Sequence, residues 1–183
     1  MNAGSEPSTT TPSSQDASPK GLAHGMRWGL KKSFIEYVRR MPDGRGSVGD
    51  GAIPVGADDL FYEHDAVNST ERGPDGPWVL AFRGDVRFSG HYGMLFVRVA
   101  HPWLEMDGDA GVLSIEDPGA RNGAPRVRLA TATLRRLGDR NGTELWGSDD
   151  VALTAEGVEL FNDVYAEGEP FEPLLVQLPV SAG

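Results

Sequence analysis

Three side chains with the chemistry for ligand binding stand out in the sequence: a histidine between two glycines, and two tyrosines in aromatic surroundings. His91 lies within VRFSGHYGML, where Gly90 and Gly93 interrupt a pattern that otherwise predicts a β-strand. Glycine inside a strand pattern indicates a bulge, or a place where another backbone or a ligand comes close. Tyr37 and Tyr165 lie in segments with helical spacing. Taken singly, each of the three is also explained as a structural residue, since a core tyrosine commonly keeps its hydroxyl at the surface.

The sequence lacks the motifs of several common activities. It has no G-x-G-x-x-G, no phosphate-binding loop, no H-E-x-x-H and no G-x-S-x-G. The four histidines show no metal-ligand spacing and cysteine is absent, so disulfides and thiolate sites are excluded and a zinc site is not expected. The acidic segment DGDAG lacks the spacing and the closing glutamate of a calcium-binding EF-hand, and it predicts a hairpin turn.

The composition is that of a globular domain with an acidic surface. The 183 residues carry a formal net charge of −10 and suffice for one core of ordinary size. Nucleic acids and anionic membranes require a concentrated basic face, so neither is expected as a partner. The sequence has no apolar run near the roughly 20 residues of a membrane span and no signal-peptide pattern. A cytoplasmic protein is therefore expected, with a secreted or cell-surface location as the alternative for a trimmed chain.

A tail rich in serine, threonine and proline precedes the folded part. Residues 1–25 cannot bury enough apolar surface to offset the entropy lost on ordering, so they are predicted to be disordered. A single domain is expected over residues 26–180. It begins with a helical pattern at residues 26–41, which predicts one apolar stripe. The stripe consists of Leu30, Phe34, Tyr37 and Met41.

The rest of the domain predicts an antiparallel β body. Residues 43–59 are rich in glycine and aspartate and are expected to form a loop, and GPDGP at 73–77 predicts a turn. A second short helix is expected over residues 155–168. Because no βαβ alternation appears, the order favours a mainly-β fold, an antiparallel β-sandwich or open barrel with two short helices, one N-terminal and one near the C-terminus. The expected extended runs are 78–90, 94–106, 111–117, 125–137, 143–154 and 173–179.

Three segments resemble, in order, signature segments of the HtaA-type haem-binding domain, a module with which corynebacteria and related actinobacteria take up haem. They are WGLKKSFIEYV near the start, VRFSGHYGML in the middle and LTAEGVELFNDVYAEGEPFEPLLVQL at the end. Together they combine W-G-x-K-x-S-F-x-x-Y, G-H-x-G and F-x-x-x-Y-x-x-G at compatible separations, and they span most of residues 26–178. The resemblance depends on this combination, because each segment alone is weak evidence.

The resemblance implies a role for each of the three side chains. Tyr37 falls on the axial ligand of ferric haem iron, His91 on the histidine that hydrogen-bonds to this tyrosine, and Tyr165 on a tyrosine that lines the haem pocket. A histidine N–H donated to the phenolate oxygen would orient the ligand and tune its donor strength. Three phenylalanines are candidates for pocket walls, and are equally well explained as ordinary core residues: Phe34, Phe88 and Phe161.

The function implied by the resemblance is non-enzymatic binding of ferric haem b in uptake, transfer or buffering, with another haem-binding protein as donor or acceptor. Two other interpretations remain: a β-sandwich module for another flat or apolar ligand, and a haem-degrading or peroxidase-like enzyme. The enzyme is disfavoured, because it needs placed polar groups on an open distal side and the sequence identifies none. The basic residues near the first helix could offset the acidic charge where anionic haem propionates bind: Arg27, Lys31, Lys32, Arg39 and Arg40.

Overall fold

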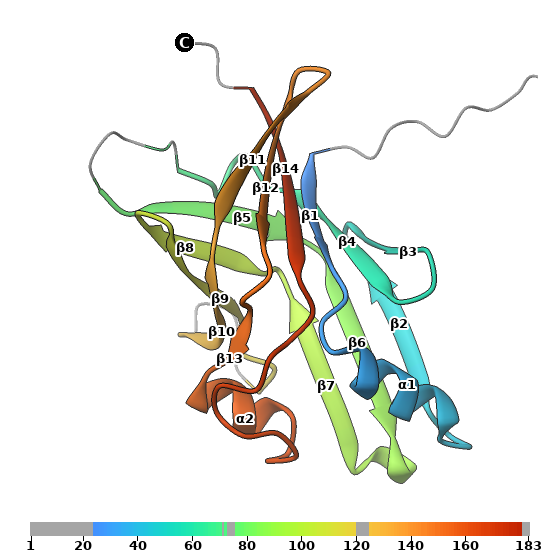
Figure 1. Cartoon of the computed structure of the whole chain (residues 1–183). Coiled ribbons are helices and arrows are strands. Elements are labelled where there is room, and N and C mark those ends of the chain that lie inside the picture. The colour runs from blue at the N-terminus through green and yellow to red at the C-terminus, as the bar shows by residue number, and fades with distance from the viewer. Residues whose placement is uncertain (1–23, 71, 73–75, 120–124, 181–183) are drawn as a thin grey trace, which may run out of the picture.

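The structure is a computed structural model that describes residues 24–70, 72, 76–119 and 125–180. These residues form fourteen β-strands, two α-helices and one short 3₁₀ helix (Figure 1). Apart from its last two residues, the predicted tail lies outside the described part, and Gly25 is the first residue of β1. The elements are β1 (Gly25–Trp28), α1 (Lys32–Arg40), β2 (Arg45–Gly49), β3 (Ala52–Val55), β4 (Asp59–His64), β5 (Trp78–Arg83), β6 (Asp85–Gly90), η1 (His91–Gly93), β7 (Leu95–Ala100), β8 (Trp103–Asp107), β9 (Ala110–Glu116), β10 (Arg126–Thr133), β11 (Arg135–Arg140), β12 (Thr143–Ser148), β13 (Ala152–Leu153), α2 (Ala155–Leu160) and β14 (Leu174–Pro179).

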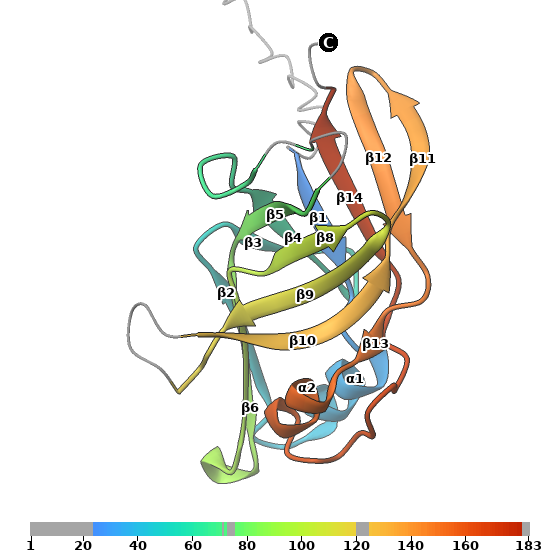
Figure 2. The same ribbon diagram turned by 90° about the vertical axis from the view of Figure 1, so that its left-hand side faces the viewer.

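Two antiparallel sheets make up the body of the molecule. The larger one runs in the order β11-β12-β14-β1-β4-β5-β8-β9-β10-β13, with β3 paired to β4. Because β11 continues β10 and β13 continues β12, the two ends of this path are formed by the same two segments, and the sheet curls into a half-barrel (Figure 2). The smaller sheet has the order β2-β6-β7. The predicted mainly-β antiparallel fold with two short helices is confirmed.

Both helices lie at one end of the molecule, beside the tip of the β6–β7 hairpin (Figure 1). Phe34 of α1 packs edge-on against Phe88 of β6, with ring centroids 5.3 Å apart, and against Phe161, at 5.1 Å. Phe161 follows α2 directly, so the two helices and the small sheet meet around Phe34. Gly157 lets α2 lie close to β10, because a Cβ at this position would collide with the Leu129 carbonyl. No helix in the described part of the chain is long and apolar enough to cross a membrane.

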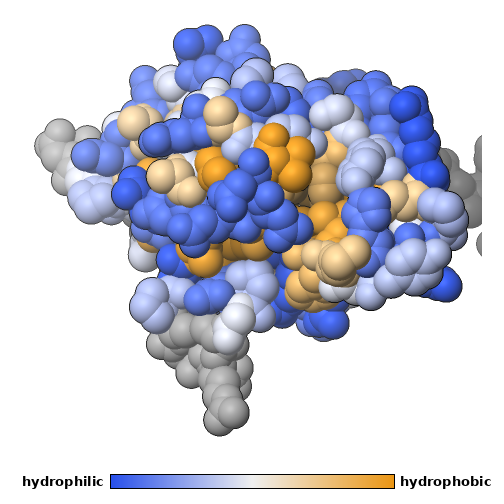
Figure 3. All heavy atoms as spheres, turned by 90° about the horizontal axis from the view of Figure 1, so that it is seen from below, coloured by the Kyte–Doolittle hydropathy of each residue, from blue (hydrophilic) through white to orange (hydrophobic). Residues whose placement is uncertain are grey.

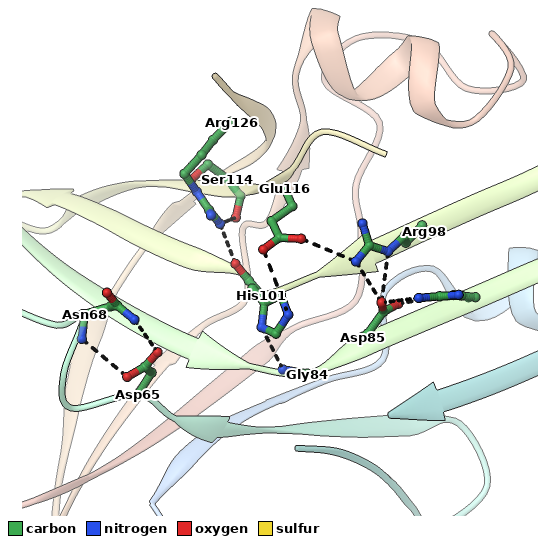
Figure 4. Close-up of polar contacts among 10 residues, drawn as sticks. Asp65, Asn68, Gly84, Asp85, Arg98, His101, Ser114, Glu116 and Arg126 are labelled. Atoms are coloured by element: carbon green, nitrogen blue, oxygen red, sulfur yellow. Dashed lines mark hydrogen bonds and ion pairs between the residues drawn. The ribbon is translucent and has the colours of Figure 1, made fainter. Parts of the chain in front are cut away.

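Two sharp bends connect β6 and β7 of the small sheet to the large one. The chain passes from β5 to β6 at Gly84, with φ +148°, and from β7 to β8 at His101, with φ +46°. The His101 N–H donates to the Gly84 carbonyl at 2.7 Å, and the Gly84 N–H donates to His101 Nδ1 at 3.5 Å (Figure 4), so the two bends hold each other in place. A Cβ at Gly84 would lie 2.8 Å from both Ala52 and Tyr62, which explains why this position needs glycine.

A buried carboxylate stabilises the strands just beyond these bends (Figure 4). Asp85 is only 4% exposed, and it accepts hydrogen bonds from Arg87 at 2.7 Å and from Arg98 at 2.8 Å. Arg98 also reaches Glu116 on β9, at 3.3 Å. The hydrogen bond from Arg87, together with that from Arg98, lowers the pKa of Asp85 to about 2. The folded state therefore favours the charged form of Asp85 more strongly than the unfolded chain does.

This shift predicts a pH-dependent contribution of Asp85 to stability. A carboxyl with a pKa near 2 when folded and near 3.9 when unfolded stabilises the fold by about 2 kcal/mol above pH 4. The contribution is lost as the pH falls through the folded-state pKa. Asp85→Asn should therefore lower the free energy of unfolding at pH 7 by about this amount, and the difference from wild type should shrink towards pH 2. Urea unfolding between pH 7 and pH 2 measures this difference in the free energy of unfolding, with Asp109→Asn in the exposed β8–β9 turn as control. A difference that does not change with pH would contradict the assignment.

Several predicted elements were wrong in extent. The start of the predicted helix at residues 26–41 belongs instead to β1, in which Met26 and Trp28 are buried and alternate with exposed Arg27. The helix begins only at Lys32, after Leu30 adopts a left-handed φ of +53°. The second helix ends at Leu160, since the next residues turn left-handed, Asn162 with φ +54° and Asp163 with φ +57°.

The predicted loop at residues 43–59 was also wrong, because it contains β2, β3 and the start of β4. Two of the predicted long strands are each divided in two by the bends at Gly84 and His101. The final run at 173–179 is confirmed as β14. The core of the predicted turn at 73–77 lies outside the described residues.

Candidate functional site

Tyr37 lies at the border between the buried and the exposed face of α1. Phe34, Ile35 and Val38 are buried against the sheets, whereas the Tyr37 side chain is 48% exposed. The predicted apolar stripe that included Tyr37 is therefore wrong. Leu30 precedes the helix, so the spacing of four residues between Leu30 and Phe34 is not a helical spacing. The buried face of α1 is turned away from Tyr37. The phenol is held on a packed helix and remains open to solvent.

His91 lies at the tip of the β6–β7 hairpin. The tip consists of three consecutive left-handed residues, His91 with φ +51°, Tyr92 with φ +55° and Gly93 with φ +90°. The Met94 N–H closes the turn by donating to the His91 carbonyl at 3.1 Å. The two glycines beside His91 thus belong to a hairpin turn and its final strand pair, and not to a bulge inside one strand. Non-glycine residues adopt this conformation at a cost, and such strain is typical of functional sites.

The structure brings Tyr37 and His91 together. They are 54 residues apart in sequence, and a hydrogen bond joins Tyr37 Oη to His91 Nε2. The ring centroids are 5.8 Å apart, with an angle of 48° between the ring planes. Either the phenol donates to an unprotonated Nε2, or a protonated Nε2 donates to the phenol oxygen. A proton can therefore pass between the two groups without any movement of the backbone.

The four tyrosines of the chain lie in different surroundings. Tyr62 is fully buried, and burial raises its pKa, so its hydroxyl stays neutral and out of reach of a ligand. Tyr92 is 92% exposed at the hairpin tip. Tyr165 packs edge-on against Phe161 and Phe171, with centroids 5.8 and 6.1 Å away. Only Tyr37 combines an exposed hydroxyl with an imidazole partner.

The predicted phenylalanines are part of the core. Phe34, Phe88 and Phe161 form one buried cluster, in agreement with their interpretation as core residues. Through Phe34, this cluster joins α1 to Phe88 of β6 and to Phe161 after α2. Tyr165 is packed against the same cluster from the segment after α2 and is only partly buried. Its ring faces the Lys31 ammonium, which lies 5.4 Å from the ring centroid.

Exposed apolar side chains follow His91 along the hairpin, and sequence reasoning missed them. Tyr92, Met94 and Phe96 follow His91 at alternate positions and are all exposed, and Val164 is exposed in the segment after α2. Viewed from the end where the helices and the hairpin tip lie, the surface shows apolar patches between polar ones (Figure 3). Apolar side chains exposed together commonly mark a binding surface. No local signal in the sequence separates the exposed Met94 and Phe96 from the buried Leu95 between them.

The basic residues near α1 are already paired with carboxylates. Lys31 donates to Glu169 at 2.5 Å and to the Pro170 carbonyl at 2.8 Å. Neighbouring carboxylates thus largely balance the positive charge of these basic residues. The residues can therefore offset less of the protein's acidic charge than their number indicates. The other pairs are Arg27 with Asp59, Lys32 and Arg39 with Asp58, and Arg40 with Glu36.

Tyr37 and His91 are both exposed, so the pair is open to solvent. Two of the larger hollows in the described structure have volumes of about 410 and 350 Å³, and neither is lined by Tyr37, His91 or Tyr165. Among the residues that the structure describes, no three histidine, aspartate or glutamate side chains converge as a metal site.

The model of the HtaA family matches residues 23–177. Comparison with curated proteins finds no relative. The structure is similar to the C-terminal domain of HtaA from Corynebacterium glutamicum, with a TM-score of 0.69 and 19% identity, covering 86% of this chain and 97% of that domain.

Two further domains from the same organism share the fold. The N-terminal domain of HtaA superposes with a TM-score of 0.66 at 20% identity, covering 88% of this chain and 100% of that one. HtaB, described as a heme binding protein, superposes with a TM-score of 0.64 at 20% identity, covering 85% of this chain and 91% of that one.

Proposed function

Because the chain belongs to the HtaA family, we propose that it binds ferric haem b through Tyr37 and acts in haem uptake, transfer or buffering. The observation that carries this proposal is the hydrogen bond between the exposed Tyr37 phenol and His91. The description of HtaB, which shares the fold, as a heme binding protein supports it. A further haem-binding protein is the expected donor or acceptor of the haem.

The Tyr37–His91 pair is suited to binding ferric haem because the imidazole can accept the phenol proton and donate it back in a hydrogen bond. A free phenol has a pKa near 10, so at neutral pH it ligates poorly unless its anion is stabilised. Bound ferric haem would supply a positive metal centre that favours the phenolate. His91 can accept the phenol proton at Nε2 and then donate that N–H back to the phenolate oxygen. The imidazole would thus hold the ligand oxygen in one orientation.

The surroundings of the pair suit a large flat apolar ligand. The hairpin tip and the segment after α2 present Tyr92, Met94, Phe96 and Val164 to solvent. Covering such side chains stabilises a complex by about 25 cal/mol per Å² of apolar surface removed from water. A carrier also benefits from an open site, because a partner protein can reach the ligand directly. An anionic oxygen ligand favours Fe³⁺ over Fe²⁺, which suits transport better than redox catalysis.

Titration of the purified protein with haemin tests the proposal. A single class of site should appear, with a Soret band and the charge-transfer bands of high-spin ferric tyrosinate. Metal-free protoporphyrin is the matched control, since it has the same shape but offers no metal to Tyr37, and it should bind clearly more weakly. Equal binding of the two would favour a module for flat apolar ligands. Loss of the porphyrin during incubation with ascorbate or peroxide would favour the enzyme.

A further inference from the structure

The turn that follows α1 lies directly against the tip of the β6–β7 hairpin. A Cβ at Gly90 would lie 2.7 Å from Met41 Cε and 3.8 Å from Gly44 Cα. Gly44 in turn lies so close to the last turn of α1 that a Cβ there would collide with the Val38 carbonyl. Asp43 is therefore held between a fixed helix end and the hairpin.

The Asp43 carboxylate binds the backbone of that hairpin. Its Oδ2 accepts a hydrogen bond from the Tyr92 N–H at 2.5 Å. Tyr92 is one of the left-handed residues at the tip and directly follows His91. This N–H is the main cause that lowers the pKa of Asp43, with smaller contributions from other groups that include His91, so the carboxyl stays ionised at neutral pH. The hydrogen bond from the Tyr92 N–H to Asp43 therefore fixes the backbone next to His91.

Two contacts thus tie the hairpin tip to α1 and its following turn: Tyr37 with the His91 ring, and Asp43 with the Tyr92 backbone. The second contact does not involve a ligand, so it can hold His91 in place before any ligand arrives. We propose that Asp43 is a positioning residue that sets the His91 imidazole against the Tyr37 phenol. The part of this inference that concerns ligand retention rests on the proposed function.

The test compares Asp43→Ala, Asp43→Asn and the control Asp109→Ala, which removes an acid from the exposed turn of another hairpin. In the ligand-free protein, amide exchange of Tyr92 should become at least about tenfold faster in Asp43→Ala, because the carboxylate no longer protects it. The nuclear Overhauser contact between the Tyr37 and His91 rings should weaken. Asp43→Asn keeps an acceptor oxygen and should lie between Asp43→Ala and wild type. Asp109→Ala should match wild type.

In the haem-loaded protein, Asp43→Ala should transfer haem to apomyoglobin about three- to tenfold faster, less than loss of a direct partner of the ligand would cause. In a His91→Ala background, Asp43→Ala should not make haem transfer any faster, since Asp43 acts through His91. Unchanged Tyr92 exchange, or an unchanged ring contact, would overturn the inference, and Asp43→Asn provides this readout if the alanine variant does not fold. If wild type fails to bind haemin, the proposed function fails, whereas the ligand-free readouts still decide the role of Asp43.

Discussion

Tyr37→Phe is expected to fold like wild type and yet to lose tight binding of ferric haem. The side chain is half exposed, and α1 is anchored by Phe34, Ile35 and Val38, so removing one hydroxyl should change the free energy of unfolding by less than about 0.5 kcal/mol. The iron would lose its anionic oxygen ligand. Loss of a residue that only hydrogen-bonds to a metal ligand typically lowers metal affinity by about 10–100-fold. Loss of the ligand itself should therefore raise the haem dissociation constant by more than about 100-fold. Haemin titration and urea unfolding of the same variant separate a ligand from a core residue.

Tyr165→Phe is the matched control, since it makes the same chemical change in a tyrosine packed against Phe161 and Phe171. It should keep the tyrosinate bands. Loss of one ordinary hydrogen bond is worth about 0.5–1.5 kcal/mol, so haem retention should weaken by about tenfold at most. If Tyr165→Phe abolishes the tyrosinate bands while Tyr37→Phe keeps them, then Tyr165 is the axial ligand and the assignment of Tyr37 is wrong.

Strands with a buried face could be predicted from sequence, whereas strands without one could not. In β14 and β8, buried residues alternate with more exposed ones, and this shows in the sequence as a pattern of apolar residues. All five residues of β2 are exposed, and two of them are glycine, so no such pattern exists there. Backbone pairing with β6 places this strand, and pairing between distant segments is not visible in a local window.

The limits of helix α1 were misjudged for a related reason. A spacing of i, i+4, i+7 and i+11 is satisfied by residues that do not share one helix, since Leu30 is left-handed and Met41 caps the end. Periodicity counts spacing and does not detect a change of backbone conformation within the window. As a result, the buried face was assigned to include Tyr37. The structure exposes Tyr37, which suits a ligand better than the predicted burial would have.

The resemblance to the HtaA-type domain was confirmed, and it singled out Tyr37 and His91 before any geometry was known. No local pattern relates two residues 54 positions apart, so their contact could only follow from knowledge of a fold. The left-handed turn that carries His91 was equally hidden. Glycine at two of four positions signals a special conformation, but it does not distinguish a bulge from a hairpin turn. The contact with Asp43 is visible only in the structure.

His91→Ala is expected to weaken haem binding without abolishing it. The iron ligand stays in place, while the group that takes its proton and orients its oxygen is lost. Loss of such a partner typically costs about 10–100-fold in metal affinity, so haem transfer to apomyoglobin should be faster by a similar factor and the charge-transfer bands should shift. Because His91 adopts a left-handed φ of +51°, alanine also leaves backbone strain at the hairpin tip. His91→Gly removes that strain together with the imidazole, so equal loss of affinity in both variants assigns the effect to the imidazole.

Combining the two changes tests whether His91 acts through Tyr37. In the Tyr37→Phe background the phenolate is already gone, so adding His91→Ala should not weaken haem binding further. Additive losses would mean that the histidine contacts the ligand independently of the tyrosine. If His91→Ala abolishes binding and Tyr37→Phe leaves it unaffected, then the histidine is the iron ligand. The exposed hairpin tip, with His91 at its left-handed turn, would in that case itself form the haem site.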